Sequence, residues 1–266
     1  MNPPPRETVL ITGASSGIGL ELAKCFAAEK SNLILVARTT AALEKLATDL
    51  REQFQIQVHV LTADLARPES PQKIFDELGR AGQVVDVLVN NAGFGLQGNF
   101  LELSLERQLE ILQVNQTALT ALTGLFLPGM MARNRGGILN VGSIAAFQPG
   151  PGMAIYFASK AYVQSFSEAL AAELSETRVA VSVLCPGPTS TNFGKVARGD
   201  KVRRRKLPGM TATDVAKLGH AKFRQRQVVI IPGLGNKLSV LLVRFIPRGV
   251  LRKLVKYFNN QIYKPE

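Results

Sequence analysis

A tyrosine and a lysine four residues apart, Tyr156 and Lys160, form the side-chain pair in this sequence best suited to proton transfer. Residues 154–174 have a helical pattern, so the two side chains share one face and their polar ends can converge. A phenol has a pKa of about 10, and a neighbouring ammonium group favours the phenolate and lowers that pKa. A tyrosine tuned in this way can exchange a proton with an alcohol or carbonyl oxygen. Ser143 lies at the end of a predicted strand, where its hydroxyl group can donate a hydrogen bond to the same oxygen.

A Y-x-x-x-K pair alone is common by chance, so its interpretation depends on the surrounding elements. The stretch TGASSGIG, residues 12–19, lies between the apolar run 9–11 and a helical pattern that begins at Leu20. Glycines at such a turn let the backbone approach a pyrophosphate, and the unpaired N–H groups of the following helix point toward it. The spacing G-x-x-x-G-x-G differs from that of the commonest dinucleotide fingerprint. The next apolar strand, 33–37, completes a βαβ unit, which favours a dinucleotide-binding loop over an ordinary turn.

Strand and helix patterns alternate through the rest of the chain. The expected strands are 9–11, 33–37, 56–60, 84–89, 137–142, 179–184 and 228–231. The expected helices are 20–29, 41–54, 71–79, 103–131 as one helix or two ending near Pro128 and Gly129, and 154–174. This alternation predicts a parallel sheet covered on both faces, a doubly wound α/β Rossmann fold of three layers. We expect one domain over residues 1–236 and a basic amphipathic extension over 237–266.

In such a sheet ligands bind outside the carboxyl ends of the strands, so the polar residues at those ends should share one crevice. The chain of 266 residues is 46% hydrophobic, which suffices for the core of one α/β domain. Cys25 and Cys185 show no metal-ligand spacing and are expected to be buried thiols. The N-terminus has no apolar signal-peptide region, and no run of 18 apolar residues occurs. We therefore expect a cytoplasmic protein, with membrane association left open.

The formal net charge is +12, and the basic surplus lies late in the chain, at 201–206, 222–226 and 237–264. Such a surplus suits nucleic acid, an anionic membrane surface or a phosphate-bearing ligand. No helix-turn-helix, zinc-finger or RNP pattern accompanies it, so nucleic-acid binding is disfavoured.

The motifs together resemble the short-chain dehydrogenase/reductase family in its compact, single-domain form. The resemblance covers about residues 7 to 235, and it rests on TGASSGIG, NNAG at 90–93, Asn115, Ser143, Tyr156-Phe-Ala-Ser-Lys160, Pro186-Gly187 and Thr191. No catalytic position of the family pattern is missing.

The resemblance implies a role for each matched residue. Tyr156 is the expected general acid/base, and Lys160 is expected to lower its pKa and to hold the nicotinamide ribose. Ser143 is expected to stabilise the substrate oxygen, and Asn115 to kink its helix and support a proton-relay water. The expected cofactor-binding residues are Gly13, Ser15, Ser16, Gly17, Ile18 and Gly19 at the turn, Asp64 and Leu65 at the adenine, Asn91, Ala92 and Gly93 at the adenosine ribose, and Pro186, Gly187 and Thr191 at the carboxamide.

Arg38 decides which nicotinamide cofactor the sequence predicts. NAD-binding sites place an acidic residue at the end of the second strand to bind the ribose 2′-hydroxyl, whereas an arginine suits a 2′-phosphate. Here that strand ends Val36-Ala37-Arg38, with no acid. A solvated surface arginine is the alternative, but the missing acid favours NADP(H), and the resemblance then suggests the reductive direction.

The substrate is poorly specified by the sequence. The resemblance places a lid over about residues 188–213, in which Arg203 to Lys206 could steer a phosphate or simply be solvated. An apolar pocket wall and ordinary packing are both open for Phe147, Pro149, Met153, Phe193 and Leu207.

The tail departs from the compact family pattern. Apolar and basic residues alternate over 237–258, and Pro247 divides two amphipathic segments. Such segments suit packing on the domain or on a neighbouring subunit, or peripheral contact with a membrane.

The sequence therefore predicts an NADP(H)-dependent oxidoreductase for a small-molecule ketone, aldehyde or secondary alcohol, with a 3-oxoacyl or other lipophilic carbonyl compound as one possibility. The alternatives are a regulatory protein that binds the dinucleotide without turnover, and a peripheral membrane reductase acting on lipids. The resemblance also implies a homodimer or homotetramer, built through the helices around 109–127 and 157–174.

Overall fold

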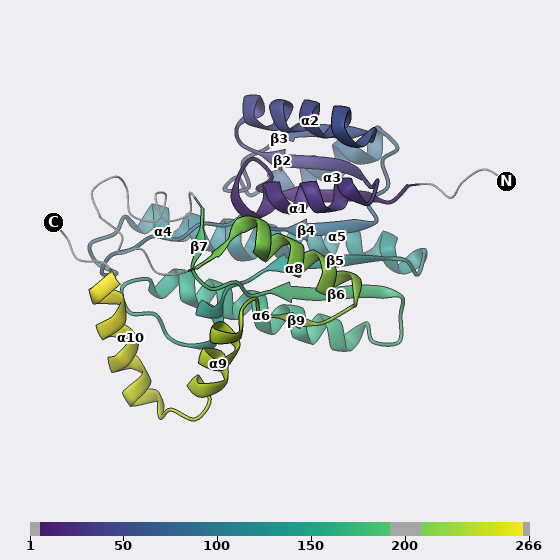
Figure 1. Cartoon of the computed structure of the whole chain (residues 1–266). Coiled ribbons are helices and arrows are strands. Elements are labelled where there is room, and N and C mark those ends of the chain that lie inside the picture. Colours follow the sequence, from purple (N-terminus) through teal and green to yellow (C-terminus); the bar gives the residue numbers. More distant parts are fainter. Residues whose placement is uncertain (1–5, 192–208, 263–266) are drawn as a thin grey trace.

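The computed structural model describes residues 6–191 and 209–262. Its centre is a parallel sheet with the strand order β3-β2-β1-β4-β5-β6-β9 (Figure 1). The strands are β1 (Thr8–Thr12), β2 (Asn32–Ala37), β3 (Val58–Thr62), β4 (Val87–Asn90), β5 (Gly136–Val141), β6 (Val179–Leu184) and β9 (Val229–Ile230). The strand order reverses between β1 and β4, which is where such sheets bind their ligands. The predicted doubly wound α/β fold is confirmed.

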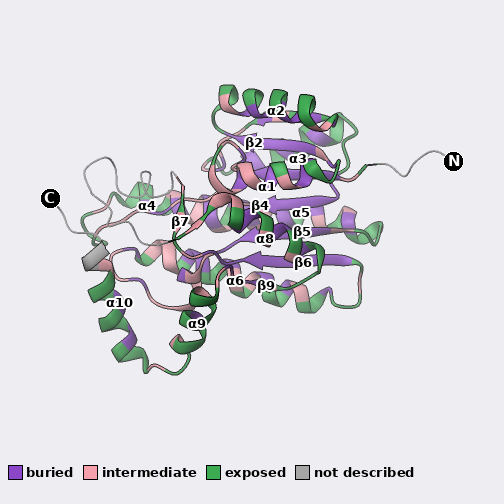
Figure 2. Cartoon of the chain, viewed as in Figure 1, coloured by how far each residue is buried: buried purple, intermediate pink, exposed green. Residues whose placement is uncertain are grey.

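Helices cover both faces of this sheet. One layer packs α1 (Gly17–Ala28), α2 (Thr40–Phe54) and α8 (Ala212–Arg224) on the sheet. The other layer packs α3 (Ser70–Arg80), α5 (Leu119–Ala132) and α6 (Ala154–Glu173). Along β1, Val9 and Ile11 enter the first layer and Leu10 enters the second. Because both faces are buried, as Figure 2 shows, the strands are almost continuously apolar.

The long helical segment between β4 and β5 differs from its predicted form. It consists of α4 (Leu105–Leu112), a π-helical turn η1 (Gln113–Ala118) and α5 in direct succession. The helix ends at Ala132, one residue past the predicted bound at residue 131, but Pro128 lies inside α5 and does not mark the end as expected. Proline weakens a helix interior, but here the helix continues because Met130, two residues further on, is fully buried in the core.

Helix α8 was not predicted, because its first residues were assigned to the expected lid. A sequence signal for its start exists: Thr211 Oγ1 accepts a hydrogen bond from the Asp214 N–H at 3.1 Å, as in a helix N-cap. The remaining elements near the site are the 3-10 helix η2 (Ile144–Phe147) and the short parallel strands β7 (Thr189–Ser190) and β8 (Met210–Thr211).

The C-terminal segment forms two helices, α9 (Leu234–Val243) and α10 (Arg248–Ile262). Figure 1 shows them projecting from the domain as a V, with the connecting turn at its tip. They are largely exposed, as the green surface of both helices in Figure 2 indicates. Within residues 6–191 and 209–262, no helix combines the length and apolar character needed to cross a membrane.

Candidate active site

A large cleft, with a volume of about 1010 Å³, opens at the carboxyl ends of the strands. It is lined by all but two of the catalytic and cofactor-binding residues predicted from the sequence. Those that line it are Gly13, Ser15, Ser16, Gly17, Ile18, Arg38, Asp64, Leu65, Asn91, Ala92, Gly93, Ser143, Tyr156, Lys160, Pro186, Gly187 and Thr191. Gly19 and Asn115 lie behind the wall of this cleft and support it.

The glycine-rich turn after β1 has a backbone that only glycine adopts readily. Gly13 has a φ of 66° and Gly17 has a φ of 59°. Gly19 is constrained by space instead, because a Cβ atom there would lie 2.3 Å from Asn91 Nδ2 and 2.4 Å from the Gly13 carbonyl oxygen. The start of α1 therefore packs directly on the turn, and its free N–H groups face the cleft.

Hydrogen bonds join the turn to the segment after β4. Thr12 Oγ1 accepts from the backbone N–H groups of Asn91 and Ala92, both at 3.0 Å. In return, Asn91 Nδ2 donates to the carbonyl oxygens of Thr12 at 2.9 Å and Gly13 at 3.1 Å. Thr12 thus organises the crevice, although sequence reasoning did not single it out. Its signal is a hydroxyl residue that ends an otherwise apolar strand.

Arg38 lies at the end of β2 with an exposed side chain on the rim of the cleft. Within the part of the chain that the structure describes, no carboxylate forms an ion pair with it. Asp64, on the neighbouring loop, accepts a hydrogen bond from the Ala66 N–H through Oδ1 at 3.1 Å, while Ser70 Oγ donates to its carbonyl oxygen at 2.7 Å. This rim combines a free guanidinium group with a fixed loop.

Lys160 extends from α6 into the floor of the cleft. Its side chain is buried, and Nζ donates a hydrogen bond to the Val141 carbonyl oxygen at 2.7 Å. Burial lowers the pKa of Lys160 to about 8, because removal from water disfavours the charged form. A Cβ atom at Gly93 would lie 3.4 Å from Nζ, so the segment after β4 covers the ammonium group closely.

Tyr156 lies one helical turn before Lys160 on the same face. The Lys160 ammonium nitrogen is 5.9 Å from the centroid of the Tyr156 ring. Gly95 packs on that ring, since a Cβ atom there would lie 2.9 Å from Tyr156 Cδ2. The predicted pair is thus brought together, with the ring held between the loop and the helix.

Ser143 lies at the end of β5, where it caps η2. Its Oγ accepts from the Ala145 N–H at 3.1 Å and donates to the Pro186 carbonyl oxygen at 3.5 Å. The second distance is long for an O–H···O hydrogen bond, so turning the hydroxyl proton toward a ligand loses little. Ser143 can therefore act as a hydrogen-bond donor in the cleft.

Asn115 is fully buried in η1, at the π-helical turn that interrupts the long helix. Its amide exchanges two hydrogen bonds with the backbone of Phe94, at 3.1 Å and 3.0 Å, and donates to Ser159 Oγ at 2.9 Å. The side chain therefore ties the loop after β4 to α6. This geometry fits a supporting residue behind the cleft.

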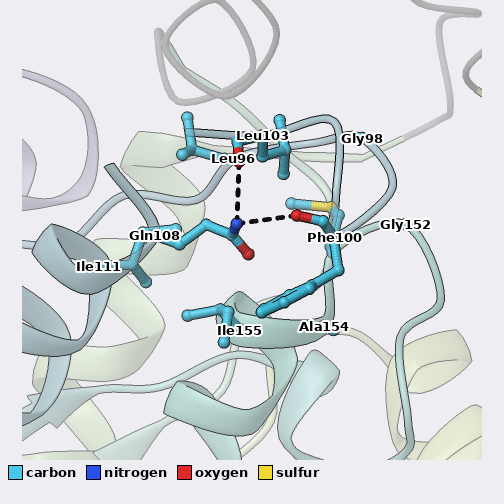
Figure 3. Close-up of a pocket in the computed structure, with 10 residues that line it drawn as sticks. Leu96, Gly98, Phe100, Leu103, Gln108, Ile111, Gly152, Ala154 and Ile155 are labelled. Carbon is cyan, nitrogen blue, oxygen red and sulfur yellow. Dashed lines mark hydrogen bonds between the residues drawn. The ribbon is translucent and has the colours of Figure 1, made fainter. Parts of the chain in front are cut away.

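A second, much smaller cavity of about 20 Å³ lies beside the cleft (Figure 3). Gln108 on α4 reaches into its wall and donates hydrogen bonds to the carbonyl oxygens of Phe100 at 3.0 Å and Leu103 at 3.2 Å. The cavity has room for no more than a water molecule. Its walls hold the loop before α4 in place.

The apolar part of the large cleft differs from the predicted wall. Met153 lines the cleft, whereas Phe147 packs against a core cluster that includes Val183. Pro149 is not part of the lining. Phe193, Leu207 and the run Arg203 to Lys206 lie outside the described residues. The lining also contains apolar residues that sequence reasoning did not name, Phe157 and, from the C-terminal helices and their connecting turn, Leu242, Val243, Ile246, Leu251, Leu254, Val255 and Phe258.

Known proteins resemble this chain over most of its length. A sequence profile described as short chain dehydrogenase matches residues 7–201. The NADP-dependent 3-hydroxy acid dehydrogenase of Schizosaccharomyces pombe is 32% identical over 236 residues, which cover 85% of this chain and 90% of that protein. The very-long-chain 3-oxoacyl-CoA reductase of Phaeosphaeria nodorum is 35% identical over 199 residues, which cover 73% of this chain and 58% of that protein.

Solved structures give the same result. A short-chain dehydrogenase from Sphingobium yanoikuyae in complex with NADPH has a TM-score of 0.80 and 33% identity, with 94% of this chain and 95% of that chain covered. A short-chain dehydrogenase/reductase from Burkholderia phymatum in complex with NAD has a TM-score of 0.79 and 27% identity, with 91% and 94% covered. This chain belongs to the short-chain dehydrogenase/reductase family of oxidoreductases, which confirms the resemblance inferred from its motifs.

Proposed function

We propose that this protein is an NADP(H)-dependent reductase of lipophilic ketones or aldehydes, able to oxidise the corresponding alcohols in reverse. The observation that carries the proposal is the meeting of Ser143, Tyr156 and Lys160 in the cleft that also contains the glycine-rich turn. A protein that only bound the dinucleotide would have no need of this proton-transfer set. The proposal therefore favours turnover over a purely regulatory role.

The cleft residues fit a nicotinamide dinucleotide. Gly13 and Gly17 have positive φ angles, which glycine adopts readily. Because glycine has no side chain, nothing at these two positions stands between the start of α1 and a bound pyrophosphate. Arg38, unpaired among the described residues and without a neighbouring acid at the end of β2, supports the 2′-phosphate form. One relative is named as NADP-dependent and another was solved with NADPH, which supports the same cofactor, although a third was solved with NAD.

When bound, the reduced nicotinamide supplies a hydride to the carbonyl carbon. The residues of this chain supply the proton that the carbonyl oxygen receives. Ser143 donates a hydrogen bond to the carbonyl oxygen, and Tyr156 transfers its phenolic proton to that oxygen. With its pKa at about 8, Lys160 stays mostly protonated at neutral pH and stabilises the phenolate that forms.

The substrate class is inferred from the cleft wall. Beyond Tyr156, the wall is formed by Met153, Phe157 and the apolar side chains of α9 and α10. An apolar wall of this extent favours a substrate whose carbonyl group is attached to a hydrophobic body, such as a 3-oxoacyl chain or a bulky ketone. The resemblance to a very-long-chain 3-oxoacyl-CoA reductase supports this class.

We propose a homodimer or homotetramer assembled through α4, α5 and α6. Leu105 and Leu109 on α4 have exposed fractions of 61% and 54%, and Tyr162 on α6 is also exposed. Large apolar side chains exposed on two neighbouring helices are typical of a subunit contact. Sedimentation of the purified protein would determine the number of subunits.

The direct test is a substrate panel. The purified chain is loaded with NADPH and mixed with 3-oxoacyl thioesters and ketones of increasing chain length, while loss of the nicotinamide absorbance is followed. We expect oxidation of NADPH, with kcat/KM rising as the apolar part of the substrate lengthens. Tight NADPH binding without oxidation by any compound would favour a regulatory protein, and oxidation only by small polar carbonyl compounds would contradict the substrate class.

A further inference from the structure

The outer face of α9 carries a stripe of apolar side chains that the domain does not cover. Leu234, Leu238 and Leu241 on α9 and Phe245 in the turn just after it follow one another at helical spacing, and their exposed fractions are 83%, 56%, 51% and 76%. The opposite face of the helix is the one that packs, through the buried Val240. An exposed stripe of this size on a folded protein indicates a binding surface.

Helix α10 repeats the arrangement. Its buried face contains Leu251 and Val255, while Val250 and Tyr257 are 50% and 60% exposed and do not line the cleft. The apolar arc of α10 is thus wider than the area that the domain covers. An exposed tyrosine beside aliphatic side chains is typical of a helix at the interface between water and lipid.

The charge of this region identifies the occupant. Lys237, Arg244, Arg248, Arg252, Lys253 and Lys256 all lie on α9, α10 or the turn between them, and all are exposed. No aspartate or glutamate occurs from residue 215 to residue 265. None of the six cations forms an ion pair with a carboxylate in the part of the chain that the structure describes. Apolar side chains flanked by unpaired cations complement an anionic lipid surface.

The turn at the tip of the V carries both an exposed apolar side chain and basic residues. Phe245 is 76% exposed and lies between Arg244 and Arg248 in the sequence. Figure 1 shows this turn at the tip of the V. A second copy of the chain is a poorer partner for this face, because a self-complementary contact would bring the two sets of six cations together.

We propose that α9, α10 and their connecting turn dock this protein on an anionic membrane surface, with Phe245 and the α9 stripe in the interface and the basic residues at the headgroups. The same two helices and their connecting turn contribute Leu242, Phe258 and Ile246 to the cleft wall. Docking therefore places the apolar side of the cleft beside the bilayer. The docking surface is separate from the proton-transfer residues, so it can be tested without an assay of turnover.

The experiment is flotation of the full chain with two kinds of vesicle, phosphatidylglycerol mixed equally with phosphatidylcholine, and phosphatidylcholine alone. We expect binding to the anionic vesicles at low salt, little binding to the neutral ones, and progressive release as salt is added. Equal binding to both kinds of vesicle, or binding to neither, would overturn the proposal.

Two double variants and one matched control sharpen the test. Arg244→Glu with Arg248→Glu, and separately Leu241→Asn with Phe245→Asn, should each weaken binding to anionic vesicles by at least about tenfold. None of these four residues lines the cleft, so NADPH binding should be unchanged, which also shows that the variants are folded. The control, Lys45→Glu with Arg80→Glu, makes the same charge change at exposed residues of α2 and α3 and should bind vesicles far better than the first variant.

Sedimentation of the same variants tests the competing occupant. If the Leu241→Asn and Phe245→Asn changes dissociate an oligomer while the unmodified chain ignores anionic vesicles, a second copy covers this face and the lipid proposal is wrong. If the oligomeric state is unchanged and vesicle binding is lost, the lipid surface is the partner.

Discussion

The ammonium nitrogen of Lys160 on α6 lies 2.7 Å from the carbonyl oxygen of Val141 at the end of β5. This hydrogen bond holds α6 against the sheet and keeps a cation in a buried position. The arrangement has a cost, since burial lowers the pKa of Lys160 from its ordinary value of 10.5 to about 8.

That lowered pKa predicts a pH-dependent stability. Between about pH 8 and 10.5 the unfolded chain keeps the Lys160 proton while the folded chain releases it, so the unfolded state binds more protons and stability rises with pH. Relative to a Lys160→Met variant, the free energy of unfolding of the unmodified chain should increase by about 1 kcal/mol between pH 8 and pH 9. Urea denaturation of both chains at pH 7, 8 and 9 measures this difference in the free energy of unfolding.

Cys185 limits the pH range in which the effect of Lys160 on stability can be measured. Burial raises the pKa of its thiol to about 12, so above pH 9 the folded chain binds more protons than the unfolded one and this residue opposes Lys160. Cys185 is present in both chains, so its effect largely cancels in the difference. A difference between the two chains that stays constant with pH would show that Lys160 is not buried as a cation.

Adding a single methyl group at Gly19 should strongly reduce both NADPH affinity and stability. In a Gly19→Ala variant the new Cβ would meet Asn91 Nδ2 and the Gly13 carbonyl oxygen, and the latter is backbone that cannot turn aside. We expect NADPH affinity to fall by at least about tenfold, with a loss of stability of about 1–3 kcal/mol from overpacking. Isothermal titration and thermal unfolding measure the two effects.

A matched control for Gly19 is available on α3. Gly79 also lies in a helix, but a Cβ atom there would meet nothing within 4 Å. Gly79→Ala should leave NADPH affinity unchanged and leave stability equal or slightly higher. Equal behaviour of the two variants would mean that the turn is not packed as described.

Arg38 is expected to distinguish the two nicotinamide cofactors. An Arg38→Asp variant loses a charge-assisted contact to the 2′-phosphate and gains a repulsive carboxylate. Its NADPH affinity should fall by at least about tenfold while its NADH affinity changes little. The control is Arg67→Asp, the same change at an exposed arginine outside the cleft lining. Parallel loss of both cofactors in the Arg38 variant would show that Arg38 does not recognise the phosphate.

The sequence predicted the fold, and the gathering of the candidate site residues in one cleft, for a simple physical reason. In a doubly wound sheet the carboxyl ends of all strands meet at one edge, so Arg38 after β2 and Ser143 after β5 had to face the same crevice. The periodicity of α6 then placed Tyr156 and Lys160 on one face. Local patterns were sufficient for these features.

Other features depend on contacts that no local pattern contains. Pro128 suggested a helix end, but core packing around Met130 continues the helix past it. Thr12 opens the glycine-rich motif, but its structural role appears only when Asn91, 79 residues later, bonds to it. The amphipathic tail suited packing on its own domain or on a subunit, or contact with a membrane, and no local pattern shows that α9 and α10 line the cleft.

The most direct test of the proposed reductase is a Tyr156→Phe variant studied with NADPH and the best substrate of the panel. Removal of one hydroxyl group keeps the ring packed under Gly95 and deletes the proton donor. We predict that NADPH affinity stays within about twofold of the unmodified protein, whereas kcat falls by at least about a hundredfold. A variant that still reduces the substrate at a comparable rate would contradict the assignment of Tyr156, and with it the proposed reaction.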